Sequence, residues 1–228
     1  MPNCENCIVK LLNPFGSLSK EESTTVSKSK RILHIKRGQP LFLEGKVLNG
    51  IYCIGSGECK VSKLTPNGKD QIVRFIKKGE IVGHKSVLNN HSAKLSVTAL
   101  EDMDVCFIPK NEVLDLFASN KQFALNLTRS ICNSLDEANM TLATMAQKNV
   151  RERLAEFLLH FDKMFGQDEE GFIAVKLTRE EIANAIGTAT ESAIRLLSEF
   201  KRDNLILLHG KQIKILNTPK LESISEGF

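Results

Sequence analysis

The chain has 228 residues, of which 42% are hydrophobic and 25% charged, with a net charge of +4 and a pI near 8.7. This length and composition predict two globular domains and exclude collagen-like and disordered classes. No apolar run reaches the roughly 18–20 residues of a membrane span, and residues 1–10 lack a signal-peptide pattern, so we predict a cytoplasmic protein. Six cysteines are too sparse for a disulfide scaffold.

Residues 32–109 predict short β-strands separated by turns. Segments 51–54 and 59–64 flank Gly-Ser-Gly, and a Thr-Pro-Asn-Gly turn at 65–68 precedes an alternating run at 71–76. Strands at such regular spacing favour consecutive hairpins that close into a barrel or a sandwich.

A long helix is expected from about residue 122 to residue 146, after a short helix near 113–117. Its apolar residues recur at spacings of three and four: Phe123, Leu127, Ile131, Leu135, Ala138, Leu142 and Met145. Small residues such as Ser134 and Thr141 accompany them, a composition suited to a dimer seam. Packing of this face against the chain's own barrel is the alternative.

The last third of the chain predicts a winged helix-turn-helix. A helix after Asn149 and an acidic loop at 166–171 come first. In chain order we then expect a strand at 172–176, a helix at 179–185, a turn at Gly187, a recognition helix at about 190–203 and a hairpin around His209-Gly210. This order of elements is typical of a DNA-binding module that places one helix in the major groove.

Two capping-box spacings support this layout. Thr178 and Glu181 have the T-x-x-E spacing that begins a helix, and Thr188 and Glu191 repeat it. The side chains expected to form the small core between the two helices are Ile182, Ile186, Ile194 and Leu197.

The recognition helix is expected to expose polar side chains at its start. There Glu191 can accept from cytosine N4, and Arg195 can donate two hydrogen bonds to guanine. The full set of predicted DNA contacts is Thr178, Arg179, Thr188, Thr190, Glu191, Ser192, Arg195, Lys201 and Lys211. A plain surface ion pair between Glu191 and Arg195 is the alternative. Residues 146–228 hold 12 Lys and Arg against 13 Asp and Glu, so DNA affinity must come from a local basic stripe.

Five sequence stretches together resemble the cyclic-AMP receptor protein/FNR family of bacterial transcription regulators. They are residues 37–45, 51–57, 79–83, 177–183 and 187–195. The resemblance implies an α+β fold, with a double-stranded β-helix (jelly-roll, cupin-like) barrel, a long dimerisation helix and a C-terminal winged helix-turn-helix. It divides the chain into an N-terminal segment (1–30), an effector-binding barrel (31–119), a dimerisation helix with hinge (120–148) and a DNA-binding domain (149–228).

The same resemblance implies a homodimer that binds double-stranded DNA at inverted half-sites, with RNA polymerase as a further partner. Glu191 and Arg195 match family positions that read the core of the half-site. Thr190 replaces an arginine that cyclic-AMP-responsive members use on another guanine, so a TTGA-like half-site is expected. A signal at the barrel would switch the regulator between two states.

The effector site is expected at the loop that cradles phosphate in nucleotide-binding members. The residues assigned to it are Gly79, Glu80, Ile81, Val82, Gly83, His84, Lys94 and Asn139. His84 stands where those members have a ribose-binding glutamate, and Ala93-Lys94 replace their arginine-serine pair. Cyclic AMP is therefore disfavoured.

Iron–sulfur and haem sensing are both left open. Cys4, Cys7 and Cys106 resemble three ligand positions of oxygen-sensing members, whose additional N-terminal cysteine would fall close to Asn13-Pro14. A redox dithiol is the alternative for Cys4 and Cys7. Haem would be bound through His84, His91 or Pro2, although a lone histidine is more often a surface residue than a haem ligand. Cys53, Cys59, Cys106 and Cys132 lie in apolar contexts typical of structural cysteines.

The sequence disfavours two other classes of protein. A cupin-like metalloenzyme needs two histidines close together on one strand, and the sequence contains no His-x-His. Nucleophilic serine, phosphate-loop and zinc-protease motifs are also absent, so we do not expect an enzyme. A ligand-binding barrel without DNA activity is opposed by the layout of residues 177–216.

Overall fold

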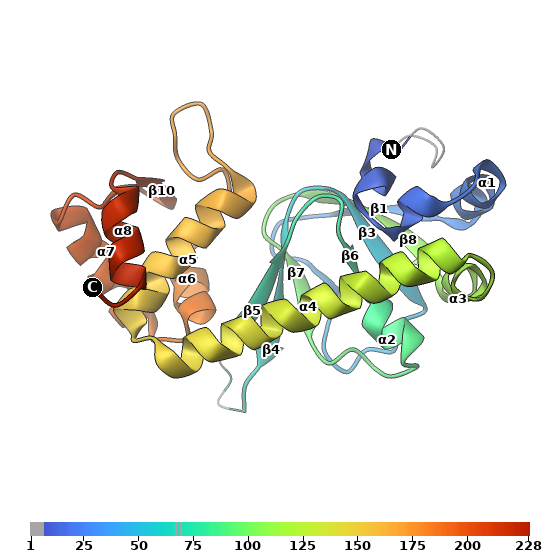
Figure 1. Ribbon diagram of the computed structural model, residues 1–228, viewed down its shortest axis with the longest axis horizontal. Helices are drawn as coiled ribbons and strands as arrows, with labels where there is room; N and C mark the ends of the chain where they lie inside the picture. The colour runs from blue at the N-terminus through green and yellow to red at the C-terminus, as the bar shows by residue number, and fades with distance from the viewer. Residues whose placement is uncertain (1–6, 67, 69) are drawn as a thin grey trace. The chain divides into compact units, whose positions relative to one another are not determined.

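The structure is a computed structural model, and it describes residues 7–66, 68 and 70–228. The chain divides into two compact units, shown in Figure 1. The first holds the chain up to Leu64 together with Arg74–Glu137, and the second holds Thr65–Val73 together with Ala138–Phe228. No helix in the described ranges is long and apolar enough to cross a membrane.

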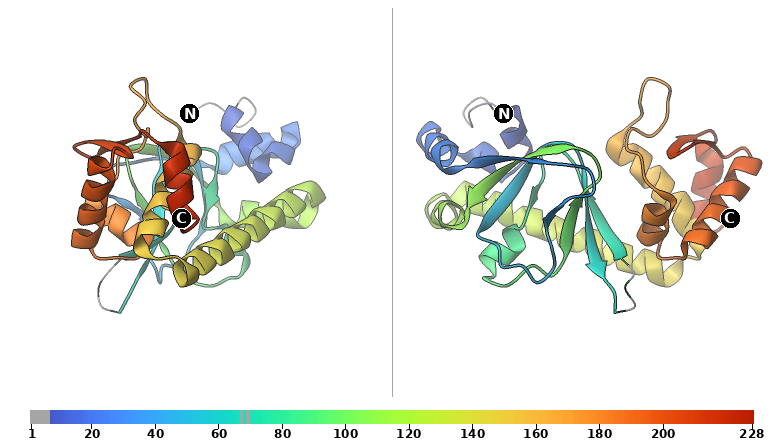
Figure 2. Two further views of the ribbon diagram at one scale, coloured as in Figure 1. Left: turned by 60° about the vertical axis from the view of Figure 1, so that its left-hand side comes forward. Right: turned by 180° about the vertical axis from the view of Figure 1, so that it is seen from behind.

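Two antiparallel sheets, each of four strands within the described residues, form the barrel. Their strand orders are β1-β8-β3-β6 and β2-β7-β4-β5. The bounds are β1 Arg31–Ile35, β2 Pro40–Phe42, β3 Gly50–Ser56, β4 Cys59–Leu64, β5 Asp70–Ile76, β6 Ile81–Val82, β7 Ser96–Ala99 and β8 Met103–Pro109. Figure 2 shows the strands wrapping around each other in two layers. The predicted jelly-roll barrel is thereby confirmed.

The core of the barrel comes from side chains on its inner faces. In the β3–β8 ladder Ile51 lies opposite Ile108, and Ile54 lies opposite Val105. All four are buried. Residues three apart on a strand point to opposite faces of the sheet, so both faces of this ladder are covered.

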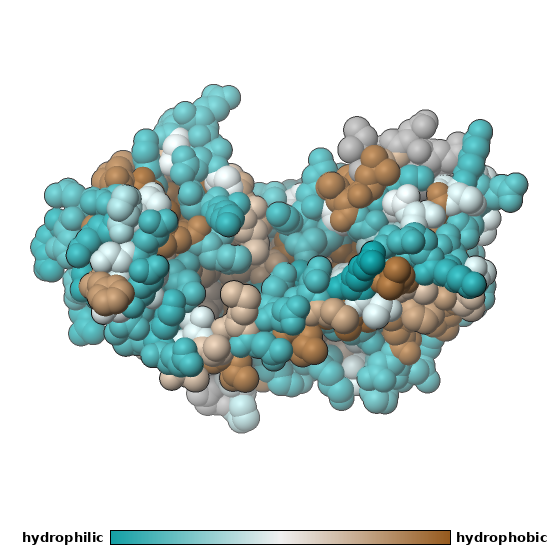
Figure 3. Space-filling model, viewed as in Figure 1, coloured by the Kyte–Doolittle hydropathy of each residue, from teal (hydrophilic) through white to brown (hydrophobic). Residues whose placement is uncertain are grey.

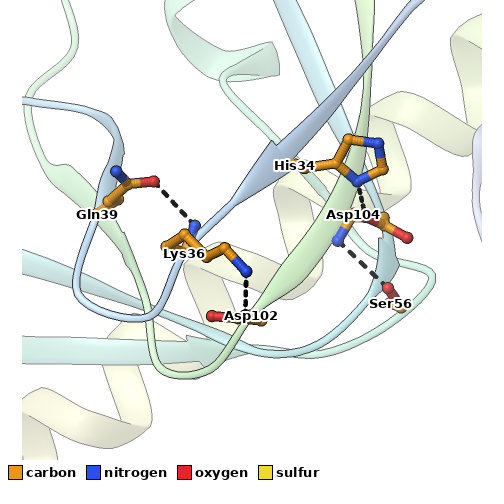
Figure 4. Close-up of polar contacts among 6 residues, drawn as sticks. All are labelled: His34, Lys36, Gln39, Ser56, Asp102 and Asp104. Carbon is orange, nitrogen blue, oxygen red and sulfur yellow. Dashed lines mark hydrogen bonds and ion pairs between the residues drawn. The ribbon is translucent and has the colours of Figure 1, made fainter.

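Polar contacts hold the open edge of the barrel beside β1 (Figure 4). His34 on β1 pairs with Asp104 on β8, and Lys36 Nζ lies 2.7 Å from Asp102 Oδ2. The backbone amide of Asp104 donates to Ser56 Oγ at 3.2 Å. These side chains are solvent-exposed, so each ion pair contributes little to stability, and they fix the local path of the chain after the strand.

The N-terminal segment packs against the barrel through two short 3-10 helices, η2 (Ile8–Leu12) and η3 (Pro14–Ser17). Helix α1 (Lys20–Ser29) follows, and Ser19 and Glu22 cap its start reciprocally. The buried ring of Phe15 lies 5.2 Å from that of Phe123, between ring centres. This aromatic contact joins the N-terminal segment to the following long helix.

Three helices accompany the barrel strands: α2 (His84–Leu88), α3 (Lys110–Ser119) and the long helix α4 (Lys121–Gln147). The long helix was predicted almost to the residue, but the apolar residues listed for it do not all have the same surroundings. Phe123 and Leu127 are fully buried, whereas Leu135 and Leu142 are 58% and 69% exposed. The predicted face therefore mixes residues that bury in the chain's own core with residues that face solvent.

The second unit is the winged helix-turn-helix. It contains α5 (Val150–Phe165), α6 (Arg179–Ile186), α7 (Thr190–Arg202), β9 (Ile206–His209), β10 (Gln212–Ile215) and α8 (Thr218–Ser225). The predicted helices and hairpin are confirmed, and α8 was not predicted.

The strand predicted at 172–176 is wrong. In this stretch only an isolated bridge between Gln167 and Ile173 forms among the described residues. Phe172, Ile173 and Val175 are buried, and the amide of Ile173 donates to Ile213 O at 2.9 Å. The apolar pattern thus reports burial of an extended segment that has no continuous strand partner.

Candidate DNA-binding and effector sites

The start of α6 is fixed by the predicted capping box. The amide of Glu181 donates to Thr178 Oγ1 at 3.1 Å, and the amide of Thr178 donates to Glu181 Oε2 at 2.8 Å. Gly187 ends the helix in the left-handed conformation, with φ of 66°. Because the amides of Gly187 and Thr188 both donate to Ala183 O, Thr188 completes the end of α6.

The second predicted capping box, at Thr188 and Glu191, is wrong. The N-cap residue of α7 is Ala189, whose side chain makes no capping hydrogen bond. Thr188 stands one residue too early, and its backbone already serves the turn after α6.

The buried face of α7 differs from the prediction at one position. Ile182, Ile186 and Leu197 are buried as expected, but Ile194 is 45% exposed. The buried stripe of α7 is Ala193, Leu196, Leu197 and Phe200. Spacings of three and four starting at Ala193 leave Ile194 outside the buried stripe.

The outer face of α7 presents the predicted reading residues. Glu191 and Arg195 are exposed, and Thr190 and Ser192 are half-exposed near the start of the helix. Arg195 Nε lies 3.9 Å from Glu199 Oε1, and no ion pair links it to Glu191 within the described part of the chain. The alternative of a Glu191–Arg195 surface pair is therefore not what the structure shows.

Basic side chains flank this face. Lys201 near the end of α7 and Lys211 in the β9–β10 turn are exposed. Arg179 Nη2 donates to Gly210 O at 2.8 Å, which ties the start of α6 to the tip of the wing. Lys214 Nζ donates to Glu170 O at 2.8 Å, so it anchors the acidic loop.

His84 does not lie on the surface, as a lone histidine commonly does. It begins α2 directly after Gly83 and is only 4% exposed. Neither ring nitrogen has a hydrogen-bond partner among the described residues. Burial, followed by the nearby charges of Lys85 and Arg74, lowers the pKa of His84 to about 4, and the backbone of Ile81 acts in the opposite direction.

The other predicted effector residues are dispersed. Lys94 is exposed in the loop before β7, and Asn139 is exposed on α4. Gly79 and Gly83 adopt φ of 96° and 88°, conformations that favour glycine. Glu80 Oε2 lies 2.6 Å from Arg74 Nη2, an ion pair that the sequence analysis missed.

The cysteines were partly misread. Cys53, Cys59 and Cys106 are buried, and Cys53 lies opposite Cys106 in the β3–β8 ladder. Cys132 is exposed on α4, so its apolar sequence context did not mean burial. Cys7 is half-buried just before η2, while Cys4 and the haem candidate Pro2 lie outside the described residues.

The predicted metal set cannot be assembled from the described residues alone. These residues contain no group of three or more potential ligands. Asn13, near the expected site of a further cysteine, donates from Nδ2 to Cys53 Sγ at 3.2 Å and to Gly79 O at 2.9 Å. At this position the chain uses an amide to join the N-terminal segment to the barrel.

A pocket of about 360 Å³ opens beside this amide, and sequence reasoning did not find it. It is lined by Leu11, Leu12, Asn13, Pro14, Arg74, Glu80, Ile81, Asn126, Arg129, Ser130, Asn133 and Glu137. Only Glu80 and Ile81 of the predicted effector residues are among them. The signal in the sequence was Arg74, a cation between apolar residues in the run at 71–76.

Comparison with known proteins identifies the family. Residues 32–120 match the cyclic nucleotide-binding domain, and residues 152–224 match the Crp-like helix-turn-helix domain. The chain is 30% identical over 228 residues to the fumarate and nitrate reduction regulatory protein of Vibrio cholerae, covering 98% of this chain and 90% of that protein. The chain belongs to the Crp/Fnr family of transcription regulators, a family of DNA-binding dimers and not of enzymes.

Other similar proteins agree. The transcriptional activator protein Anr of Pseudomonas protegens is 29% identical, over 99% of this chain and 93% of Anr. FixK2 from Bradyrhizobium japonicum shares the fold with a TM-score of 0.77 at 22% identity, covering 86% of this chain and 96% of that chain. A Crp/Fnr regulator from Eubacterium rectale superposes with a TM-score of 0.78 at 19% identity, covering 93% and 97%.

Proposed function

We propose that this regulator binds, as a homodimer, an operator of two inverted half-sites, and that α7 of each subunit reads one half-site. The observation that carries this proposal is the orientation of α7. Its apolar stripe is buried while Glu191 and Arg195 face outward near its start. Helices presented in this way place their first residues against base edges in the major groove.

Each predicted contact takes a specific role in the proposal. Glu191 and Arg195 read bases, with Thr190 and Ser192 beside them. Lys201 and Lys211 are exposed cations beside this face, and in the proposal they contact phosphates, which fixes the position of the protein without reading sequence. Thr178, Arg179 and Thr188 position the helices through their caps and the wing contact.

Further parts of the predicted function remain proposals. They are the TTGA-like half-site, contact with RNA polymerase, the domain limits at residues 30, 119 and 148, and the cytoplasmic location that a promoter-binding protein requires. The signal is an effector or a redox change, for which an iron–sulfur cluster at Cys4, Cys7 and Cys106 or haem near His84 stay predictions. Cyclic AMP stays disfavoured, because His84 is buried where a ribose contact would be needed.

Selection from random duplexes followed by fluorescence anisotropy tests the reading role of α7. We expect Arg195→Ala to lose about 1–3 kcal/mol of discrimination at one guanine of the selected half-site, because a bidentate contact to O6 and N7 is removed. Lys201→Ala is the matched control. It should weaken binding to selected and scrambled duplexes alike and lower the salt slope by about one. Equal weakening of both duplexes by Arg195→Ala would contradict base reading.

A further inference from the structure

Packing contacts and hydrogen bonds hold the residues around the pocket beside Asn13 in place. Leu12 packs against Gly79 so closely that a Cβ on Gly79 would lie 2.8 Å from Leu12 Cβ. Asn13 is tied to Cys53 and Gly79, and Phe15 packs on Phe123. Its volume of about 360 Å³ falls within the roughly 300–1,000 Å³ usual for small-molecule sites.

One of the two guanidinium groups in the pocket is already engaged. Arg74 Nη2 lies 2.6 Å from Glu80 Oε2, and Arg74 Nε lies 2.7 Å from Glu137 Oε2. Arg74 Nη1 also donates to Ser134 Oγ at 2.9 Å. Arg74 and these two carboxylates thus form a cluster with a formal net charge of −1, and Arg74 joins β5 to α4.

The second guanidinium group, that of Arg129, is available to a ligand. Arg129 is exposed on α4, and within the described residues no carboxylate pairs with it. Asn126, Ser130 and Asn133 lie beside it on the pocket wall and offer amide and hydroxyl groups. The four charged lining residues therefore sum to zero, and among the described residues Arg129 is the lining cation without a carboxylate partner, next to uncharged hydrogen-bonding groups.

The placement of these charges, with the unpaired cation at Arg129 and the negative cluster at Arg74, selects the class of ligand. A planar carboxylate matches the donor fork of a guanidinium. A dianion would place its second negative charge near Glu80 and Glu137, whose carboxylates repel it. Burial raises the pKa of Glu80, which shows that negative charge is already costly on that wall.

We propose that this pocket binds a small monocarboxylate with a polar body, held by Arg129 and by the amides of Asn126 and Asn133. The site is distinct from the predicted cradle at Gly83, His84 and Lys94, none of which lines it. The ligand bridges the N-terminal segment, the β5–β6 turn and α4, so its binding strengthens the attachment of α4 to the barrel. Any effect on DNA binding rests on the proposed function, whereas ligand binding itself does not.

Calorimetric titration of the full chain with lactate, glycerate and gluconate tests the proposal, with succinate and inorganic phosphate as dianion probes. We expect saturable binding of at least one monocarboxylate, weakened roughly tenfold or more by Arg129→Gln. Arg129→Lys, which keeps the charge, should retain most of the affinity. Lys121→Gln, an equal charge loss at an exposed α4 position outside the pocket, should leave binding unchanged.

Three results would overturn the site: no binding of any monocarboxylate, binding of the dianions alone, or equal binding by Arg129→Gln and Lys121→Gln. Operator binding by the wild-type protein without any probe is measured in parallel. If that binding is absent while a monocarboxylate still binds through Arg129, the proposed function fails and the pocket stands. If it is present and no probe binds, only the pocket proposal fails.

Discussion

At the scale of single residues, the burial of His84 has a consequence that can be measured. The folded protein holds the pKa of this imidazole at about 4, whereas an unfolded chain returns it to about 6.5. Between these values the unfolded state binds a proton that the folded state does not. The stability contributed by neutral His84 is therefore complete above pH 6.5 and is lost as the pH falls toward 4.

We expect this loss to reach roughly 3 kcal/mol, and His84→Leu should remove it. Urea unfolding at pH 4.5 and at pH 7.5 gives the free energy of unfolding for each variant. The difference between the two pH values should shrink in His84→Leu, and at pH 7.5 the variant should be at least as stable, because an unpaired buried polar group is gone. His91→Leu, at an exposed histidine, should keep the wild-type difference. An unchanged pH dependence in His84→Leu would refute the assignment.

The residue scale also shows why the site was only partly predictable. Glu191 and Arg195 were found because exposure at the start of a helix follows from the pattern of that helix alone. Ile194 was predicted to be buried because α7 has more apolar residues than one face can bury. The sequence does not say which of its stripes is the buried one. The pocket was missed because residues 11–14, 74–81 and 126–137 meet only in the folded barrel.

At the scale of elements, the N-terminal segment and the β5–β6 turn depend on each other. Gly79 and Gly45 both have positive φ, 96° and 83°. Gly45 has no atom within 4 Å of its added Cβ, whereas Gly79 faces Leu12. The two glycines form a matched pair in which only one supports another element.

Gly79→Ala and Gly45→Ala should therefore differ in stability. Each loses about 1–2 kcal/mol from a left-handed backbone that alanine disfavours. Gly79→Ala should lose about 1–3 kcal/mol more, as overpacking displaces Leu12. Chemical unfolding gives the free energies, and limited proteolysis should cut near residues 8–18 faster only in Gly79→Ala. Equal losses and equal cleavage would show that the segment does not press on this turn.

Element boundaries were predicted well wherever a cap or a turn residue fixed them. Thr178 and Gly187 bound α6 through contacts within a few residues of sequence. The extended segment at 172–176 lacked such a local signal. Alternating apolar residues were read as a strand, but tertiary burial rather than a strand partner explains them.

At the scale of the whole molecule, α4 carries an exposed, mostly apolar stripe that shares Leu135 and Leu142 with the face predicted from the sequence. The residues follow alternating spacings of three and four, and all are exposed: Leu125, Thr128, Cys132, Leu135, Asn139, Leu142 and Ala146. Figure 3 shows brown, apolar atoms along this helix among hydrophilic neighbours. Such a heptad is typical of a two-stranded coiled coil, in which Asn139 fixes the register.

A parallel pairing of two α4 helices places identical positions of the stripe opposite each other. Cys132 would then face Cys132 of a second copy near the dimer axis. Oxidation of the two thiols by diamide, which accepts their two electrons and two protons, should join the subunits covalently. We expect a disulfide-linked dimer on a non-reducing gel, and Cys132→Ser should abolish it even though other cysteines remain.

The same stripe predicts how dimerisation controls DNA binding. Leu135→Asp places a charge in the middle of the seam, where each dimer would bury two of them at a cost of several kcal/mol. Sedimentation should then show a monomer at micromolar concentration, and diamide should no longer cross-link Cys132. Operator affinity should fall because a single subunit binds only one half-site. Val47→Asp, at another exposed apolar residue, should leave all three measurements unchanged. A dimer that survives Leu135→Asp would place the subunit interface elsewhere, because the stripe cannot close around two buried carboxylates.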